Sequence, residues 1–176
     1  CLLTLLLLAL PITAAQAAVT LSGTVTAQGG EPIDGATVLI SRSDEETKQV
    51  SSGADGAWRA TFDEGGAFSF LASHPAYQSQ VWAGQNCSSE SMCTVLFGDL
   101  LFAADDADEA GIDFSLRRRG SLSGTVRLES SGSPAEGVQV FAIDPYEVQA
   151  GTVATTDASG VWRIDGLFPG DYSVLA

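Results

Sequence analysis

Few side chains in this sequence could carry out catalysis. His74 is the single histidine, and Pro75 follows it. A zinc peptidase site needs two histidines and a glutamate, and a Ser-His-Asp triad would also have to use His74. No Gly-x-Ser-x-Gly or other nucleophile motif accompanies it. We therefore predict no catalytic residue and no cofactor, and we interpret His74 as a structural residue near a strand end.

An acidic cluster is the one candidate for metal binding. Ca²⁺ prefers several carboxylate oxygens at one point, and the candidate ligands are Asp105, Asp106, Asp108 and Glu109. Asp113 follows, but the spacing is not that of an EF-hand loop. Because the whole chain is acidic, we favour a solvated acidic loop over a calcium site. We expect the basic run Arg117–Arg119 to pair either with this loop or with the junction to the next unit.

Three tryptophans could stack on sugar rings. Trp58 and Trp162 occupy equivalent positions in the repeat described below, which favours core packing for both. Trp82 lies outside the repeated pattern, and Gln80, Gln85 and Asn86 beside it could bond sugar hydroxyls. Trp82, Gln85 and Asn86 are therefore the candidate glycan site. A packed Trp82 that anchors a nearby disulfide loop is the interpretation we favour.

Composition limits the function classes. The chain has 176 residues, 45% of them hydrophobic and 17% charged, which suits one or two packed domains. It carries 8 basic and 22 acidic residues and a net charge of -14. A polyanion repels phosphate, so nucleic acid is not an expected partner. The expected partner is an unknown protein or a glycan surface.

The first residues resemble a secretory signal. Leu2–Leu10 is apolar except for Thr4, and Ala15–Ala17 is an A-x-A cleavage pattern. We predict a signal peptide over 1–17, cleaved after Ala17. The apolar run is too short to span a membrane, which takes roughly 20 residues, and no later segment is longer. The expected location is the periplasm, the cell surface or the extracellular space. The missing start methionine and basic region predict that the sequence begins inside a longer reading frame.

The cysteines fit an oxidising compartment. Cys1 would leave with the signal peptide, so Cys87 and Cys93 form the remaining pair. A zinc site would lack ligands, because no histidine or second cysteine pair lies nearby. We predict a disulfide. In the chain-entropy model, closing so short a loop stabilises the fold by roughly 2–2.5 kcal/mol.

The chain contains an internal duplication. Its matching segments are Leu21–Val25 with Leu122–Val126, Gly35–Val38 with Gly137–Val140, Ser51–Arg59 with Thr155–Arg163, and Phe68–Ala72 with Tyr172–Ala176. The offset grows from 101 residues at Leu21 and Leu122 to 104 residues at Phe68 and Tyr172, as small loop insertions would produce. A repeat of this length is the size of a β-sandwich domain.

Each repeat has the pattern of short strands. The expected strands of the first are Val19–Thr26, Ala36–Ser41, Trp58–Phe62, Ala67–Ser73 and Gly111–Leu116, the last with Ile112, Phe114 and Leu116 inward. Asp55-Gly56 and Ser159-Gly160 supply the positive-φ residue of tight hairpin turns. No segment shows a sustained helical period, so we predict an all-β sandwich.

These motifs resemble the carboxypeptidase regulatory-like domain, a transthyretin-like or prealbumin-like β-sandwich. The pattern is Leu-Ser-Gly-Thr-Val, a Pro-x-x-Gly turn and strand, Asp-x-x-Gly-x-aromatic, and Pro-Gly-x-Tyr-x-Val. The second repeat matches it best, whereas the first has Gly65-Gly66 for Pro-Gly and Gly53 for Asp. Trp58 and Trp162 replace the usual Tyr or Phe. The segment from Tyr77 to Leu116 looks like the connector between such repeats in secreted bacterial proteins.

The resemblance implies tandem Ig-like, prealbumin-like Greek-key sandwiches after the signal peptide. We expect the first over 18–119, including the Cys87/Cys93 connector, and the second over 120–176. The second lacks a counterpart of 77–119 and stops within a strand, so we expect it to be incomplete. In the family this module is an accessory lobe, and no catalytic domain is visible here.

The function predicted from the sequence is that of a secreted, non-enzymatic β-sandwich repeat. It would act as a structural spacer or as a binding or display domain of a larger extracellular protein. One alternative is a carbohydrate-binding module. Another is an accessory domain of a larger hydrolase or outer-membrane receptor, which sequence beyond Ala176 would decide.

Overall fold

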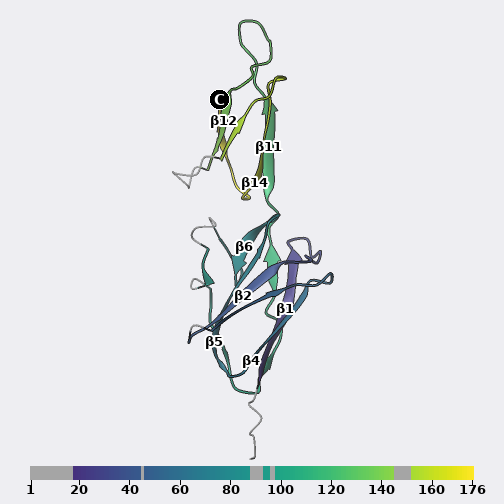
Figure 1. Ribbon diagram of the computed structural model, residues 1–176, viewed down its shortest axis with the longest axis vertical. Helices are drawn as coiled ribbons and strands as arrows, with labels where there is room; N and C mark the ends of the chain where they lie inside the picture. The colour runs from purple at the N-terminus through teal and green to yellow at the C-terminus, as the bar shows by residue number, and fades with distance from the viewer. Residues whose placement is uncertain (1–17, 45, 88–92, 96–97, 145–151) are drawn as a thin grey trace, which may run out of the picture.

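The computed structural model describes residues 18–44, 46–87, 93–95, 98–144 and 152–176. The regular elements of these residues are β-strands, and they form two units that follow one another along the long axis (Figure 1). This confirms the predicted all-β class. Within the same residues, no helix is long and apolar enough to cross a membrane.

One sheet of the first unit is built around β1 (Val19–Ala27), in which apolar residues alternate with small polar residues. The sheet contains β1, β4 (Ala57–Phe62), β9 (Asp108–Glu109) and β10 (Phe114–Leu116). Strand β4 pairs antiparallel with one edge of β1. Strands β9 and β10 pair parallel with the other edge of β1. The parallel pairing brings the end of the first unit back beside its beginning.

The second sheet of this unit is larger. Its strands are β2 (Thr37–Arg42), β3 (Thr47–Ser51), β5 (Gly66–His74), β6 (Tyr77–Val81), β7 (Gln85–Asn86) and β8 (Leu101–Ala103). They run in the order β3-β2-β5-β6-β7, and β8 pairs with the start of β5. Both sheets contribute side chains to one core, so the unit is a two-layer sandwich.

The core follows from the period-two patterns. Trp58, Ala60 and Phe62 alternate with exposed residues along β4. Phe62 meets Phe68 of the opposite sheet edge-on, with ring centroids 4.9 Å apart. Ile112, Phe114 and Leu116 are all buried, which confirms their predicted orientation.

A close crossing separates β9 from β10. The amide of Ile112 donates to the carbonyl of Ser22 at 3.1 Å. Any Cβ on Gly23 would collide with the Ile112 carbonyl oxygen, so this position needs glycine. Beside it, Oδ1 of Asp113 accepts hydrogen bonds from both the amide and the hydroxyl of Thr24, each at 2.8 Å. At this point the Asp113 carboxylate, and not a backbone carbonyl, accepts the hydrogen bond from the Thr24 amide.

The second unit has the same plan with fewer strands. Strand β11 (Gly120–Thr125) pairs with β14 (Val161–Leu167), and β12 (Gln139–Ile143) pairs with β13 (Thr152–Thr155) and β15 (Ser173–Leu175). Its core is smaller and contains Val140, Ala142, Trp162, Ile164 and Leu167. Trp58 and Trp162 are 3% and 9% exposed, which confirms that both pack inward.

A buried hydroxyl occupies the same place in both units. The Ser52 hydroxyl donates to the Ile33 carbonyl at 2.6 Å and accepts from the Ala36 amide at 2.9 Å. Thr156 repeats the arrangement: its hydroxyl donates to the Ala135 carbonyl at 2.6 Å and accepts from the Val138 amide at 2.9 Å. We call each of these a hydroxyl clasp. Each one fastens the end of the third strand to the loop before the second strand.

Two predictions from the sequence need correction. Gly56 and Gly160 do have positive φ, at 76° and 72°, but their turns do not close hairpins. Strand β3 pairs with β2, and β4 pairs with β1, so the turn at Gly56 carries the chain from one sheet to the other. The segment from Tyr77 to Leu116 is also more than a connector, because it supplies β6 to β10 of the first sandwich.

We predict that Ser52→Ala destabilises the first unit by about 1–3 kcal/mol, because it leaves a buried carbonyl and a buried amide without a partner. Unfolding in urea, followed by tryptophan fluorescence, measures the change. Ser51→Ala is the matched control, since Ser51 is the exposed residue just before Ser52, at the end of β3. Equal free energies of unfolding for the two variants would contradict the role of the clasp.

Candidate functional site: the junction between the two sandwiches

The connection between the two units is short and bonded to the first unit. Arg117–Arg119 lead from β10 into β11. The Arg117 carbonyl accepts from the Gln78 amide at 2.8 Å, and the Arg119 amide donates to the Ala76 carbonyl at 3.0 Å. These bonds and the antiparallel bridge between Tyr77 and Arg118 extend the edge of β6, so the connection is part of the sheet structure.

The side chain of Arg119 contacts both units. Its Nε donates to the Tyr77 carbonyl in the first unit at 2.9 Å. Its Nη1 donates to the Gly166 carbonyl in the second unit at 3.3 Å. The guanidinium also lies over the ring of Phe168, 4.7 Å from its centroid. Of the two expected roles for the arginine run, the junction is therefore the one that Arg119 performs.

Two surface clefts flank the junction, and Arg118 lines both. One cleft lies between Pro75 and Ala76 of the first unit and Arg163 and Asp165 of the second. The other includes Tyr77, Glu31 and Pro169. The hydrogen bond from Arg163 to Asp165 raises the pKa of the Arg163 guanidinium above its ordinary value. The contacts of Arg119 can restrict the relative orientation of the two units.

The predicted disulfide is present next to this junction. Cys87 and Cys93 are joined, with Cα atoms 5.2 Å apart. The Cys87 amide donates to Ser79 at 3.0 Å, and its carbonyl accepts from Nε2 of Gln78 at 2.6 Å. The backbone amide of Gln78 is also the donor to the Arg117 carbonyl. The disulfide segment is thus anchored to the strand that holds the junction.

The candidate glycan residues lie around the hairpin of β6 and β7. The ring of Trp82 is half-buried and meets Phe70 edge-on, with centroids 5.8 Å apart. Gln80 is 5% exposed, and its amide group bonds the backbone of Ser115 and the side chain of Asn86. Gln85 and Asn86 are exposed. This placement favours a packed Trp82 and uses Gln80 for structure, so it adds no specific support for a sugar site.

The acidic cluster is divided among separate contacts. Asp105 accepts from the Gly65 amide at 2.7 Å, and Asp108 lies 3.9 Å from the guanidinium of Arg59. Glu109 belongs to β9, and Asp106 lies in a turn with φ of 63°. Within the described ranges, no three histidine, cysteine or acidic side chains gather closely enough to hold a metal ion.

The remaining predicted residues have simple environments. Nδ1 of His74 accepts from the Ala76 amide at 3.2 Å, and its ring meets Tyr77 edge-on. This is the environment of a structural residue at a strand end. The predicted cleavage position Ala17 lies outside the described residues.

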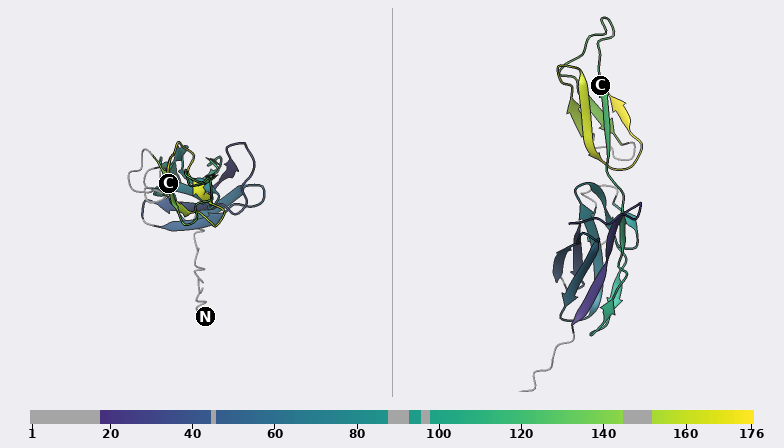
Figure 2. Two further views of the ribbon diagram at one scale, coloured as in Figure 1. Left: turned by 90° about the horizontal axis from the view of Figure 1, so that it is seen from above. Right: turned by 90° about the vertical axis from the view of Figure 1, so that its right-hand side faces the viewer.

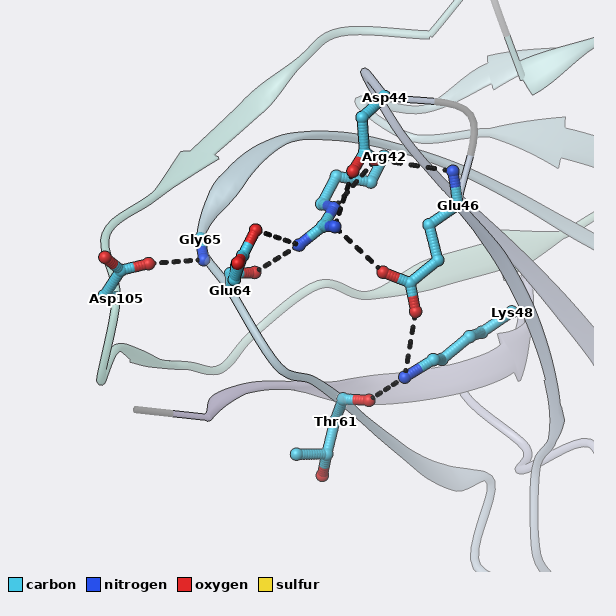
Figure 3. A network of polar contacts seen from close by, with 8 residues as sticks. All are labelled: Arg42, Asp44, Glu46, Lys48, Thr61, Glu64, Gly65 and Asp105. Atoms are coloured by element: carbon cyan, nitrogen blue, oxygen red, sulfur yellow. Dashed lines mark hydrogen bonds and ion pairs between the residues drawn. The ribbon is translucent and has the colours of Figure 1, made fainter. Parts of the chain in front are cut away.

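An ion-pair network closes the opposite end of the first sandwich (Figure 3). Arg42 is 9% exposed and donates to both carboxylate oxygens of Asp44, at 2.8 and 2.6 Å. It also bonds the Glu64 carbonyl and pairs with Glu46 at 3.1 Å. Lys48 extends the network from Glu46 to the carbonyl of Thr61. The hydrogen bond from Arg42 holds the pKa of Asp44 below its ordinary value.

The fold and the duplicated motifs define a family. The model of the carboxypeptidase regulatory-like domain matches residues 20–87 and again 121–176. The chain therefore belongs to the carboxypeptidase regulatory-like domain family, as its sequence motifs predicted. The sequence matched no curated protein.

Solved structures of similar fold come from several kinds of protein. The Streptococcal ancillary pilin has a TM-score of 0.55 at 12% identity, covering 92% of this chain and 54% of the pilin. This chain thus spans about half the length of that pilin. The Bacillus anthracis TIE protein has a TM-score of 0.45 at 13% identity, covering 90% of this chain and 28% of that one. Chlorocatechol 1,2-dioxygenase from Pseudomonas putida has a TM-score of 0.40 at 12% identity, covering 61% and 63%. At these identities the likeness concerns the fold alone.

The sequence revealed only part of the junction. The arginine run was visible as a feature, but its partners were not. Tyr77 and Gly166 contribute backbone carbonyls, which any residue could supply. Phe168 lies in the segment that matched the family pattern, but nothing marked its ring as the platform for Arg119.

We predict that the Asp44→Asn variant loses stability in a pH-dependent way. Because the folded pKa of Asp44 is lowered, its contribution is complete above the ordinary aspartate pKa and is lost as the pH falls through the folded value. The difference in free energy of unfolding between wild type and variant should therefore be present at pH 6 and shrink towards pH 2. Asp34→Asn, in an exposed turn, is the control. A difference that is constant over this range would contradict the prediction.

Proposed function

We propose that this chain is an exported, non-catalytic β-sandwich repeat that serves as a structural spacer or display module of an extracellular protein. The observation that carries this proposal is the junction between the two sandwiches, where Arg119 bonds a carbonyl in each unit. A spacer must be extended, and it must resist bending where its units meet. The two sandwiches lie end to end (Figure 2). The backbone of the connecting residues bonds the first unit, and the side chain of Arg119 bonds the Gly166 carbonyl of the second.

The restraint at the junction is more than the covalent connection would supply. Domains joined through small interfaces move relative to one another by default. Here the connecting backbone bonds the edge of β6, and Arg119 holds a carbonyl in each unit. The planar guanidinium lets Arg119 donate in fixed directions while it stacks on the Phe168 ring. These contacts support a defined angle between the units.

Two further features support export. The Cys87–Cys93 disulfide is of a kind that persists in oxidising compartments and is rare in reducing ones. The net charge of -14 keeps such a chain soluble at a crowded surface. Both features suit a protein exposed outside the cytoplasm.

We predict that Arg119→Ala loosens the junction without unfolding either unit. Small-angle X-ray scattering should show a broader distribution of overall dimensions, while far-UV circular dichroism stays the same. Arg118→Ala is the matched control, because it removes the same charge from an exposed side chain. Indistinguishable scattering from wild type and Arg119→Ala would contradict the spacer proposal.

We also predict that exported material carries no free thiol at Cys87 or Cys93. Alkylation followed by mass spectrometry should modify both residues only after reduction. Complete alkylation of both without reductant would count against an oxidising compartment.

A further inference from the structure

We propose that the cleft between Ala76 of the first unit and Arg163 of the second binds the carboxylates of an acidic peptide segment on a partner protein. We call it the junction cleft, and its basic residues are Arg118, Arg119 and Arg163. The proposal rests on the spacer role, because residues of both units line the cleft and their relative orientation shapes it. It goes further by naming a partner for the junction.

The charge of the junction cleft is opposite to that of the chain. Its charged lining is Arg118, Arg119, Arg163 and Asp165, which gives three positive charges and one negative charge. The whole chain has a net charge of -14, with 22 acidic residues against 8 basic ones. The cleft is therefore a local positive site on an acidic molecule. Because the walls of a cleft focus the electric field, this site attracts a carboxylate that the rest of the surface repels.

Two of the three guanidiniums are already held in place. Arg119 bonds the carbonyls of Tyr77 and Gly166, which orient its positive charge without neutralising it. Arg163 is held by Asp165, whose Oδ1 accepts a hydrogen bond from Nε of Arg163 at 2.8 Å. Side chains that are ordered before binding lose little conformational entropy when a ligand arrives.

Arg118 is the guanidinium that can make the new contact. Its side chain is exposed, and within the described part of the chain no hydrogen bond or ion pair involves it. Its backbone is fixed, because Arg118 forms an antiparallel bridge with Tyr77. The planar guanidinium binds a carboxylate through two parallel hydrogen bonds. Arg118 therefore holds the carboxylate, and Arg119 and Arg163 supply the surrounding charge.

The size and surroundings of the cleft favour a short acidic segment over a longer polyanion. The cleft has a volume of about 520 Å³, and ligand clefts usually measure roughly 300–1,000 Å³. A polymer with a charge on every unit, such as an acidic polysaccharide, would extend over acidic surface that repels it. A peptide with two carboxylates between neutral residues places its charge in the cleft alone.

A short peptide tests the proposal directly. The probe is Gly-Ser-Glu-Ser-Glu-Ser-Gly, acetylated and amidated so that only its glutamates are charged, and it is titrated into the full chain at low ionic strength. Two-dimensional ¹H–¹⁵N NMR reports both the affinity and the residues that respond. We expect saturable shifts at Arg118, Gly120 and Ser121, and weaker binding as salt is added. The peptide with both glutamates replaced by glutamine should bind about tenfold more weakly or worse, because its hydrogen bonds lose one charged partner.

Paired protein variants locate the site. Arg118→Ala should weaken binding about tenfold or more, because it removes the hydrogen bonds to the carboxylate. Arg118→Lys should restore only part of the affinity, because an ammonium group lacks the planar fork of donors. Arg127→Ala removes the same charge outside both junction clefts and should leave the affinity unchanged. Circular dichroism confirms that the variants are folded.

Small-angle X-ray scattering separates this proposal from the spacer role. Arg118→Ala should scatter like the wild type, so a loss of binding in this variant reports recognition of the peptide and not loosening of the junction. A wild-type chain that scatters as two independent units, yet binds the peptide through Arg118, would contradict the spacer role and leave the peptide site standing.

Three outcomes would overturn the proposal. One is no saturable binding at millimolar peptide. Another is an affinity that does not change in Arg118→Ala or with the glutamine peptide. The third is tighter binding of polygalacturonate than of the peptide at equal carboxylate concentration, lost in Arg118→Ala, which would assign the cleft to an acidic polysaccharide.

Discussion

The hydroxyl of Ser52 lies buried between a carbonyl and an amide of the loop before β2, and the first sandwich is arranged around this contact. The Ile33 amide in the same loop donates to the Val25 carbonyl of β1, and the Val25 amide donates to the Gly56 carbonyl. A Cβ on Gly56 would lie 2.6 Å from the Val25 oxygen, so the turn must contain glycine. Since β1 belongs to one sheet and β2 to the other, these bonds hold the two sheets in a fixed offset. Thr156 repeats the arrangement in the second unit.

The junction is bonded to the first sandwich through β6. This strand pairs with β5 in one sheet, and the side chain of Gln80 bonds the backbone of Ser115 in the other. The backbone of Arg117–Arg119 then continues from β10 along the edge of β6. The orientation of the second sandwich is therefore set by strands that pack on the core of the first. Arg119 restrains it further, because its guanidinium bonds the Gly166 carbonyl and lies over the Phe168 ring.

The sequence predicted the fold best where one face of a strand is buried. Trp58–Phe62 and Ile112–Leu116 alternate clearly, because their inward side chains are large and apolar. Strand β6 does not alternate: Gln78, Ser79 and Gln80 are buried although they are polar. Their amides and hydroxyl are useful only through partners elsewhere in the fold, which a local pattern does not reveal. The turn at Asp55-Gly56 has the same chemistry whether it closes a hairpin or crosses between sheets. The disulfide was predictable because Cys87 and Cys93 are the two cysteines that remain once Cys1 is assigned to the predicted signal peptide.

The central claim is that the two sandwiches share one fixed orientation. Residual dipolar couplings of backbone amides in a weakly aligned sample test it most directly, because each unit reports its own alignment tensor. A single tensor should fit the couplings of both units, with equal magnitude and axes that match the structure. Tensors of clearly different magnitude for the two units would show that they reorient independently, and this result would contradict the account.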